Sequence, residues 1–451
     1  MNNYKVDLYM PSYKALSNLG APIFLSLGSA TVMSTISGIF LARLGTDYIA
    51  AAGIVMIIFS VAVVFIVGVV GGIEYWTASF IGSGRESDIP TYFLTACGIS
   101  LFLSSVFLIL SVAALSYMAV RFTPTGLSFE MLIKYGYLTF FGYFAIGLQT
   151  VGRQILQIMG KGRSVSLIIC LGCVLLIFVY SFIFSNYIGL PAESKLYYSA
   201  IALLVIRIIM AGSTLVLVHR SMKDVGKRKL SSSAFIDILR VGVPFGMMGV
   251  LEVGVFSLYA YLATFMGTAS LAAHHIATSF VTAVFVLPST LGVLSTIWIG
   301  YAFGRRDFPD ILVRYKALER LAFWGAVSIT VLIIVFREAI GSFWTDDPVV
   351  LEVLLSVLFV AAAFQMFDWF NIFLAGCFRG LGNTAIPALA NALGHWAVGV
   401  PSAVILSSYF DFGVSGLWWG VLIGLLFSSG LAFVLFNREL RRINSFTAIA
   451  L

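Results

Sequence analysis

Three acidic residues lie in the middle of long apolar stretches of this sequence. They are Glu74, Glu252 and Asp368, and none has a basic residue within one helical turn to neutralise it. If helices carry them through a bilayer, each ionised carboxylate costs about 3 kcal/mol or more, so such acids usually face a cavity or a partner and have a function. Two acids with nearby oxygen dipoles are suited to holding Na⁺ or a proton. The alternative for each is a protonated carboxyl group that is hydrogen-bonded between helices.

The composition indicates that lipid surrounds the elements that carry these acids. The chain has 451 residues, of which 60% are hydrophobic and only 10% are charged. A helix needs roughly 20 apolar residues to cross the hydrocarbon core of a bilayer. Apolar runs of at least that length cover residues 16–42, 49–81, 90–120, 131–158, 165–188, 196–219, 238–265, 271–303, 315–336, 348–377, 384–408 and 413–436. The sequence therefore predicts an all-α integral membrane protein with twelve transmembrane helices.

The two halves of the chain resemble each other when the sequence is slid along itself by one fixed offset. The offset places Gly20 on Gly242 and Pro22 on Pro244, and it places Gly82 on Gly304. Because it spans six helices, an even number, both halves enter the membrane with the same orientation. We expect two six-helix bundles that enclose a central cleft and are related by a pseudo-two-fold axis along the membrane normal.

The positions of the basic residues predict the orientation of the chain. The net charge is +7, but most Lys and Arg residues fall in segments on one side of the expected membrane, which is typical of cytoplasmic loops and not of nucleic-acid binding. We expect a cytoplasmic segment at 1–15, an N-lobe at 16–219, a basic cytoplasmic linker at 220–237, a C-lobe at 238–436 and a cytoplasmic tail at 437–451. Both termini are then cytoplasmic, and the protein lies in a bacterial inner membrane.

The order of short motifs along the whole chain resembles the multidrug and toxic compound extrusion (MATE) family of the MOP flippase superfamily. The motifs include Val243-Pro244, Leu251-Glu252-Val253, Leu271-Ala-Ala-His274-His275, Phe364-Gln365-Met366-Phe367-Asp368 and Phe378-Arg379-Gly380-Leu-Gly382. Each motif is a weak signal alone, but their joint order and spacing is specific.

The resemblance implies a role for the acids of the second half. It places Glu252 and Asp368 on the family's cation-site acids, as the ligands of a monovalent cation and of no other metal. Phe256 then occupies a position that offers a ring face to a cation, and Phe364 stands where some relatives carry a tyrosine. Glu74 is a further coupling candidate. Ser37 stands where many prokaryotic relatives carry an aspartate, which puts a coupling role of the first helix in doubt.

Polar and adaptable apolar side chains are candidates for a solute cavity. Gln149 and Arg153 are spaced to share one helix face, although Arg153 has the alternative of extending to the cytoplasmic surface. Met247, Met366 and Trp369 are suited to lining a cavity for flat or bulky compounds. The alternative for these three is packing or contact with lipid.

We expect a monomeric secondary antiporter without an enzymatic activity or cofactor. It would export an organic cation, drug or toxic secondary metabolite while Na⁺ or H⁺ enters by alternating access. No nucleotide-binding G-x-x-x-x-G-K-[ST] loop is found in the sequence. The nearest rival is a flippase for lipid-linked oligosaccharides, which would need several cationic residues in the cleft. A membrane-embedded enzyme is the remaining alternative and would need clustered His or Asp residues at a membrane face.

Overall fold

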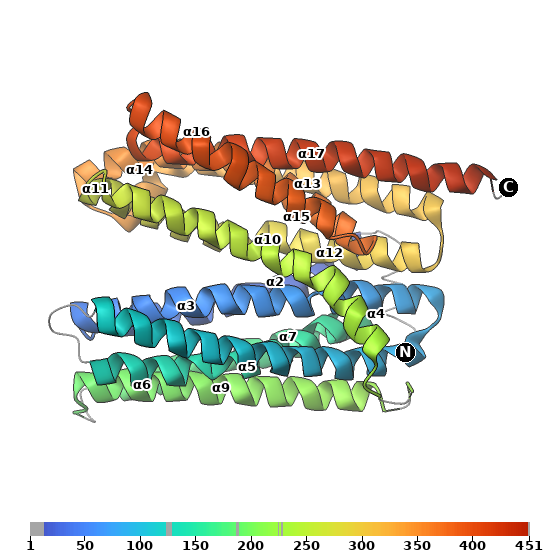
Figure 1. Ribbon diagram of the computed structural model, residues 1–451, viewed down its shortest axis with the longest axis horizontal. Helices are drawn as coiled ribbons and strands as arrows, with labels where there is room; N and C mark the ends of the chain where they lie inside the picture. The colour runs from blue at the N-terminus through green and yellow to red at the C-terminus, as the bar shows by residue number, and fades with distance from the viewer. Residues whose placement is uncertain (1–12, 123–128, 186–188, 224, 227–228, 450–451) are drawn as a thin grey trace. The chain divides into compact units, whose positions relative to one another are not determined.

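The computed structural model describes residues 13–122, 129–185, 189–223, 225–226 and 229–449, and it forms two compact units (Figure 1). The first unit comprises the described residues up to Thr77 together with Arg85–Gly246. The second comprises Ala78–Gly84 and the residues from Met247 onward. Each unit is described below by itself.

The first unit is built from long apolar helices. In chain order they are α2 (Tyr13–Ala42), α3 (Thr46–Val70), α4 (Gly72–Ser83), the short η1 (Glu86–Asp88), α5 (Ile89–Phe122), α6 (Phe129–Phe140), α7 (Gly142–Leu156), the π-helical η2 (Gln157–Lys161), α8 (Gly162–Ile183) and α9 (Ala192–Ser221). The last residues of α4 belong to the second unit. Helix α9 packs along α6, α7 and α8, and α8 packs along α2.

The second unit begins inside α10 (Ser232–Thr264), whose first half belongs to the first unit. It continues with α11 (Thr268–Val284), α12 (Val286–Gly304), α13 (Phe308–Trp344), α14 (Pro348–Gly380), α15 (Ala385–Ala392), the π-helical η3 (Leu393–Gly399), α16 (Val400–Val404), the π-helical η4 (Ile405–Tyr409) and α17 (Gly413–Ile449). Helix α14 is central, because it packs against α11, α12, α13 and α17. Many residues of α14 are therefore buried.

The described residues contain eleven continuous helical segments that are long and apolar enough to cross a membrane. One of them, Glu130–Ile183, is 54 residues long. As a single helix it would measure roughly 80 Å, more than twice the thickness of a hydrocarbon core. Gly160 interrupts it with a left-handed backbone (φ 74°). The segment is therefore two crossings, and the described part of the chain has the twelve crossings that were predicted. Large exposed side chains such as Phe102 and Phe178 suit contact with lipid.

Left-handed backbone positions repeat in the two halves at the predicted offset. Gly45 and Gly267 (φ 111° and 98°) each precede a helix, and Gly160 and Gly382 (φ 74° and 73°) each end one. Two further pairs are Gly84 with Arg306 and Gly189 with Asp411, and all four pairs share the offset that relates the sequences of the two halves. Six of these eight positions are glycine, the residue that adopts this conformation without strain, so the two halves share their turn geometry.

The expected lobe boundaries stay predictions, because the compact units reflect contacts and not the position of a membrane. Helix α10 begins at Ser232, inside the segment expected as the linker, and α17 continues to Ile449 through the segment expected as the tail. Residues 1–12 of the expected N-terminal segment lie outside the described residues.

Each unit has its own apolar core. The core of the first unit is formed by α3, α5, α6 and α7 with residues such as Ala51, Ile66 and Tyr143. The core of the second is formed around α14 and α17 with residues such as Ala361, Phe364 and Trp418. Helix α14 thus carries Asp368 through the core of the second unit.

Candidate functional site

Helix α14 places two polar side chains inside the core of the second unit. Asp368 is 2% exposed, and Gln365, one turn before it, is fully buried. Neither the Oδ2 atom of Asp368 nor either polar atom of the Gln365 amide finds a hydrogen-bond partner among the described residues. Since buried polar groups in native proteins are nearly always hydrogen-bonded, this turn of α14 needs an external partner, such as a cation, a proton or water.

A second carboxyl group lies next to this turn. Glu252 is partly buried on α10, close enough to Asp368 for the two charges to repel each other. Neither carboxyl forms an ion pair with any side chain that the structure describes. The pair is therefore acidic without a basic counterpart, so it is stable only when a proton or a cation reduces its charge.

Aromatic rings pack beside the acidic pair. Phe256, one turn after Glu252, lies edge-on to Phe364 with ring centroids 6.4 Å apart. Both rings also contact Trp418 of α17, at centroid distances of 6.1 and 6.3 Å. The predicted residues Glu252, Phe256, Phe364 and Asp368 are thus brought into one neighbourhood, and Trp418 joins them. The cation–π role of Phe256 stays a prediction.

The π-helical segment η3 contacts α10 at the turn that carries Glu252. The Trp396 indole donates a hydrogen bond to the Leu251 carbonyl oxygen (3.2 Å) and packs against Gly254. The preceding residue, His395, is buried with its Nδ1 atom unpartnered among the described residues, as are both polar atoms of Asn391 one turn earlier. Interruptions of this kind in α-helices are frequent at functional sites.

Sequence reasoning did not select Gln365, Asn391 or His395 as ligands. A usable signal for Gln365 was its place one helical turn before Asp368. For Asn391 and His395 the signal was their i, i+4 spacing in an otherwise apolar run. No group of three or more His, Cys, Asp or Glu side chains suited to a metal ion occurs in the described ranges. Among the described residues, no third His, Cys, Asp or Glu side chain therefore joins Glu252 and Asp368 in a group suited to a metal ion.

The sequence also suggested Glu74, Gln149 and Arg153, and all three lie in the first unit. Glu74 is 2% exposed on α4, in the first unit. Arg153 is 9% exposed on α7, and its Nη1 donates to Gln157 Oε1 (3.4 Å), whose amide donates to Ser26 Oγ (2.7 Å). Arg153 therefore takes part in a buried polar network between α7 and α2, whereas Gln149 on the same helix is partly exposed.

The three apolar residues expected to line a solute cavity, Met247, Met366 and Trp369, differ in how exposed they are. Met247 is 45% exposed on α10, and Met366 is partly buried on α14. The Trp369 ring is buried over Gly325 of α13, where an added Cβ would lie 2.1 Å from the ring. A role of these residues in binding solute stays a prediction.

Comparisons with known proteins match the two halves separately. The family model described as MatE matches residues 22–183 and again residues 244–405, so the two matches are separated by the same offset as the paired glycines. A curated relative, "Probable multidrug resistance protein NorM" of Bacillus subtilis (strain 168), is 24% identical over 430 residues, which cover 91% of this chain and 92% of the relative. "Multidrug resistance protein NorM" of Burkholderia vietnamiensis is 27% identical over 426 residues, which cover 91% and 90%.

A solved structure has the same fold. "Crystal structure of MATE in complex with MaL6" superposes with a TM-score of 0.90 at 20% sequence identity, covering 99% of this chain and all of that chain. The expected resemblance and the twelve-helix fold class are confirmed by these matches.

Proposed function

Because the chain belongs to the MatE family of secondary transporters, we propose that it is an antiporter that exports organic cations, drugs or a toxic metabolite in exchange for Na⁺ or H⁺. The protein is a multi-pass membrane transporter and not an enzyme. The coupling ion, the class of solute and the side of the membrane on which the termini lie belong to the proposal.

The single observation that carries the coupling proposal is the acidic pair of the second unit. Glu252 and Asp368 repel each other, and neither has a basic partner among the described side chains. A monovalent cation or a proton that enters between them removes this repulsion. Buried amide oxygens nearby, such as Gln365 Oε1, are suitable further ligands.

The coupling follows from the charge of the pair. With the cation bound, α10 and α14 can pack closely because the repulsion between them is reduced. Without it, the pair keeps a net negative charge that attracts a cationic solute. Ion and solute therefore favour different states of the same helices, which is the condition for exchange. Inward movement of one net positive charge across 100 mV releases about 2.3 kcal/mol, enough for roughly a 50-fold gradient of a neutral solute. Export of a cationic solute instead needs more than one ion per solute or the concentration gradient of the ion itself.

The solute class rests on the relatives and on the side chains near the pair. Both NorM relatives are named for multidrug resistance. The partly buried ring of Phe256, beside two acids, suits flat cationic compounds. Because Lys and Arg gather in segments on one side of the expected membrane, we place the protein in the cytoplasmic membrane with both termini in the cytoplasm. We expect it to be a monomer.

The test is efflux from proteoliposomes with Na⁺ and pH gradients imposed separately. A fluorescent organic cation such as ethidium serves as solute. We expect one of the two gradients to drive efflux in the wild-type protein and neither to drive it in Glu252→Gln or Asp368→Asn. Glu338→Gln, which neutralises an exposed acid of α13 in the same unit, is the matched control and keeps full activity. Gradient-driven efflux by both site variants at the wild-type rate would remove the coupling assignment.

A further inference from the structure

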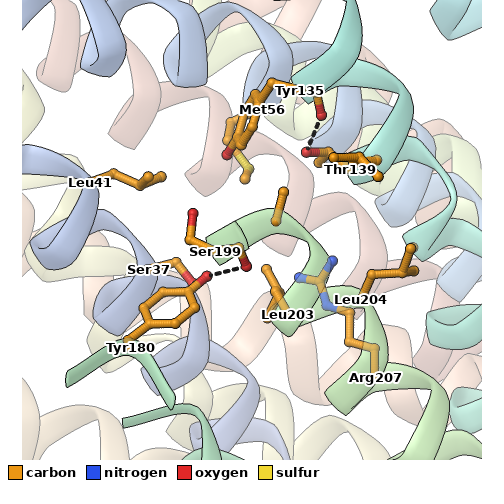
Figure 2. Close-up of a pocket in the computed structure, with 13 residues that line it drawn as sticks. Ser37, Leu41, Met56, Tyr135, Thr139, Tyr180, Ser199, Leu203, Leu204 and Arg207 are labelled. Carbon is orange, nitrogen blue, oxygen red and sulfur yellow. Dashed lines mark hydrogen bonds between the residues drawn. The ribbon is translucent and has the colours of Figure 1, made fainter. Parts of the chain in front are cut away.

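The first unit contains a pocket that carries a positive charge, in contrast to the acidic pair Glu252 and Asp368 of the second unit (Figure 2). Side chains from α2, α3, α6, α7, α8 and α9 line it. The polar ones are Ser37, Tyr135, Thr139, Tyr180, Ser199 and Arg207. No carboxylate is among the residues that line it, so Arg207 supplies its only formal charge.

Arg207 lies near the middle of α9, at the depth of the hydrocarbon core. It forms no ion pair and no hydrogen bond with any side chain or backbone atom in the described part of the chain. The guanidinium lies over the Phe59 ring, 5.2 Å from its centroid, and beside Gly142, where an added Cβ would come within 2.9 Å of Nη1. The titratable groups that interact with it electrostatically are the phenols of Tyr135 and Tyr180. Since arginine stays charged in proteins, a negative partner is missing.

Hydroxyl groups beside Arg207 are placed to complete an anion site. Tyr180 Oη donates to the Ser199 carbonyl oxygen at 3.0 Å and lies 3.4 Å from Ser37 Oγ. Thr139 Oγ1 donates to the Tyr135 carbonyl oxygen at 2.9 Å. Hydroxyl hydrogens rotate, so these groups can turn their donors from backbone carbonyls to an anion in the pocket. The residues that carry the guanidinium and these hydroxyls line the same pocket.

The size of the pocket limits the anion that fits. The volume open to the centre of a water-sized molecule is about 10 Å³, which is room for about one such molecule. A chloride ion is somewhat larger than water, so it fits once the side chains around it shift slightly outward, whereas a drug or a lipid headgroup does not fit.

We propose that Arg207 and the hydroxyls of this pocket bind a small monovalent anion such as chloride. The anion supplies the negative charge that the described residues do not give Arg207. The site is independent of the acidic pair in the second unit, because its residues all belong to the first. The two halves, alike in their turns, thereby hold ions of opposite sign.

The experiment measures binding of ³⁶Cl⁻ to the purified full-length protein by scintillation proximity, with gluconate as the other anion in the buffer. We expect saturable binding that unlabelled chloride and bromide displace and that gluconate does not. Arg207→Gln should weaken binding at least about tenfold, because it removes the charge-assisted hydrogen bonds. Arg320→Gln, which removes an exposed arginine of α13, is the control and binds as the wild type does.

A second pair of variants tests the charge of the pocket without altering Arg207. Ser37→Asp introduces a carboxylate that competes with the anion for Arg207, so we expect at least about tenfold weaker chloride binding. Ser37→Asn has the same shape as the Asp variant without the charge, so the tenfold weakening is measured against Ser37→Asn, and any loss common to both variants reports the removal of the Ser37 hydroxyl. Equal chloride affinity in the Asp and Asn variants, wild-type affinity in Arg207→Gln, or no saturable binding to the wild-type protein would each overturn the proposal.

Discussion

Replacing Asp368 with asparagine separates a coupling role of this residue from a structural one. The substitution keeps the shape of the side chain and removes its charge. Asp368 is 2% exposed, and its Oδ2 atom is without a partner among the described residues. The change therefore breaks no ion pair and no hydrogen bond of that oxygen, and we expect the free energy of unfolding to change by less than about 1 kcal/mol.

The effect of the same substitution on the cation is large. A charge-assisted contact contributes about 1.5–3 kcal/mol, so its loss weakens binding of the coupling ion roughly 10- to 150-fold. Glu252→Gln should have a similar effect, and the double variant should lose less than the sum, because both carboxyls hold the same ion. Cation affinity follows from the thermal unfolding midpoint measured over a series of Na⁺ concentrations at fixed pH and, for protons, over a pH series.

The sign of the pH effect is fixed by the chemistry of the pair. Protons and Na⁺ compete for the same carboxylates, so stabilisation by Na⁺ should fade as the pH falls, if Na⁺ is the ion. A variant with unchanged cation affinity but a lower unfolding midpoint would refute the reasoning. That result would identify Asp368 as a protonated group that is hydrogen-bonded between helices.

Three further perturbations follow from the structure. Glu74→Gln should reduce efflux only in part, and an inactive but folded Glu74→Gln beside an active Glu252→Gln would move the ion site to the first unit. Gln365→Leu removes a buried amide without partners among the described residues. It should weaken cation binding and leave the thermal unfolding midpoint unchanged or raised. A lowered midpoint would show that the amide stabilises the fold. Gly376→Ala would bring a Cβ within 2.3 Å of the Gly292 carbonyl oxygen and should lower the free energy of unfolding by about 1–3 kcal/mol. Gly430→Ala, whose added Cβ would have nothing within 4 Å, is the control and should leave the free energy of unfolding unchanged. Equal midpoints for the two alanine variants would contradict the close approach of α12 and α14.

Much of the fold could be predicted from the sequence, because a bilayer imposes strong and local requirements. Apolar runs of sufficient length predicted twelve crossings, and the repeat of glycines and prolines at a fixed offset predicted the match between the halves. Gly160 illustrates the limit. Two apolar runs meet there without a long polar loop, and only the left-handed backbone shows where the chain turns.

The candidate site was harder to predict, since it depends on contacts between distant segments. Hydropathy identifies Glu252 and Asp368 as unusual, but their proximity to each other and to Trp418 is a tertiary feature. Arg207 was missed for the same reason. An arginine in the middle of an apolar run is as unusual as an acid there, but only the surrounding helices show that they bring it no acid among the described residues.

The most direct test of the acidic pair as the coupling site is ion movement driven by solute alone. Proteoliposomes are loaded with a cationic solute, no ion gradient is imposed, and countermovement of Na⁺ and of H⁺ is recorded with separate dyes. We expect solute exit to drive entry of one of the two ions in the wild-type protein and of neither in the Glu252→Gln, Asp368→Asn double variant. Ion entry at the wild-type rate in the double variant, or solute exit without ion entry in the wild type, would contradict the account.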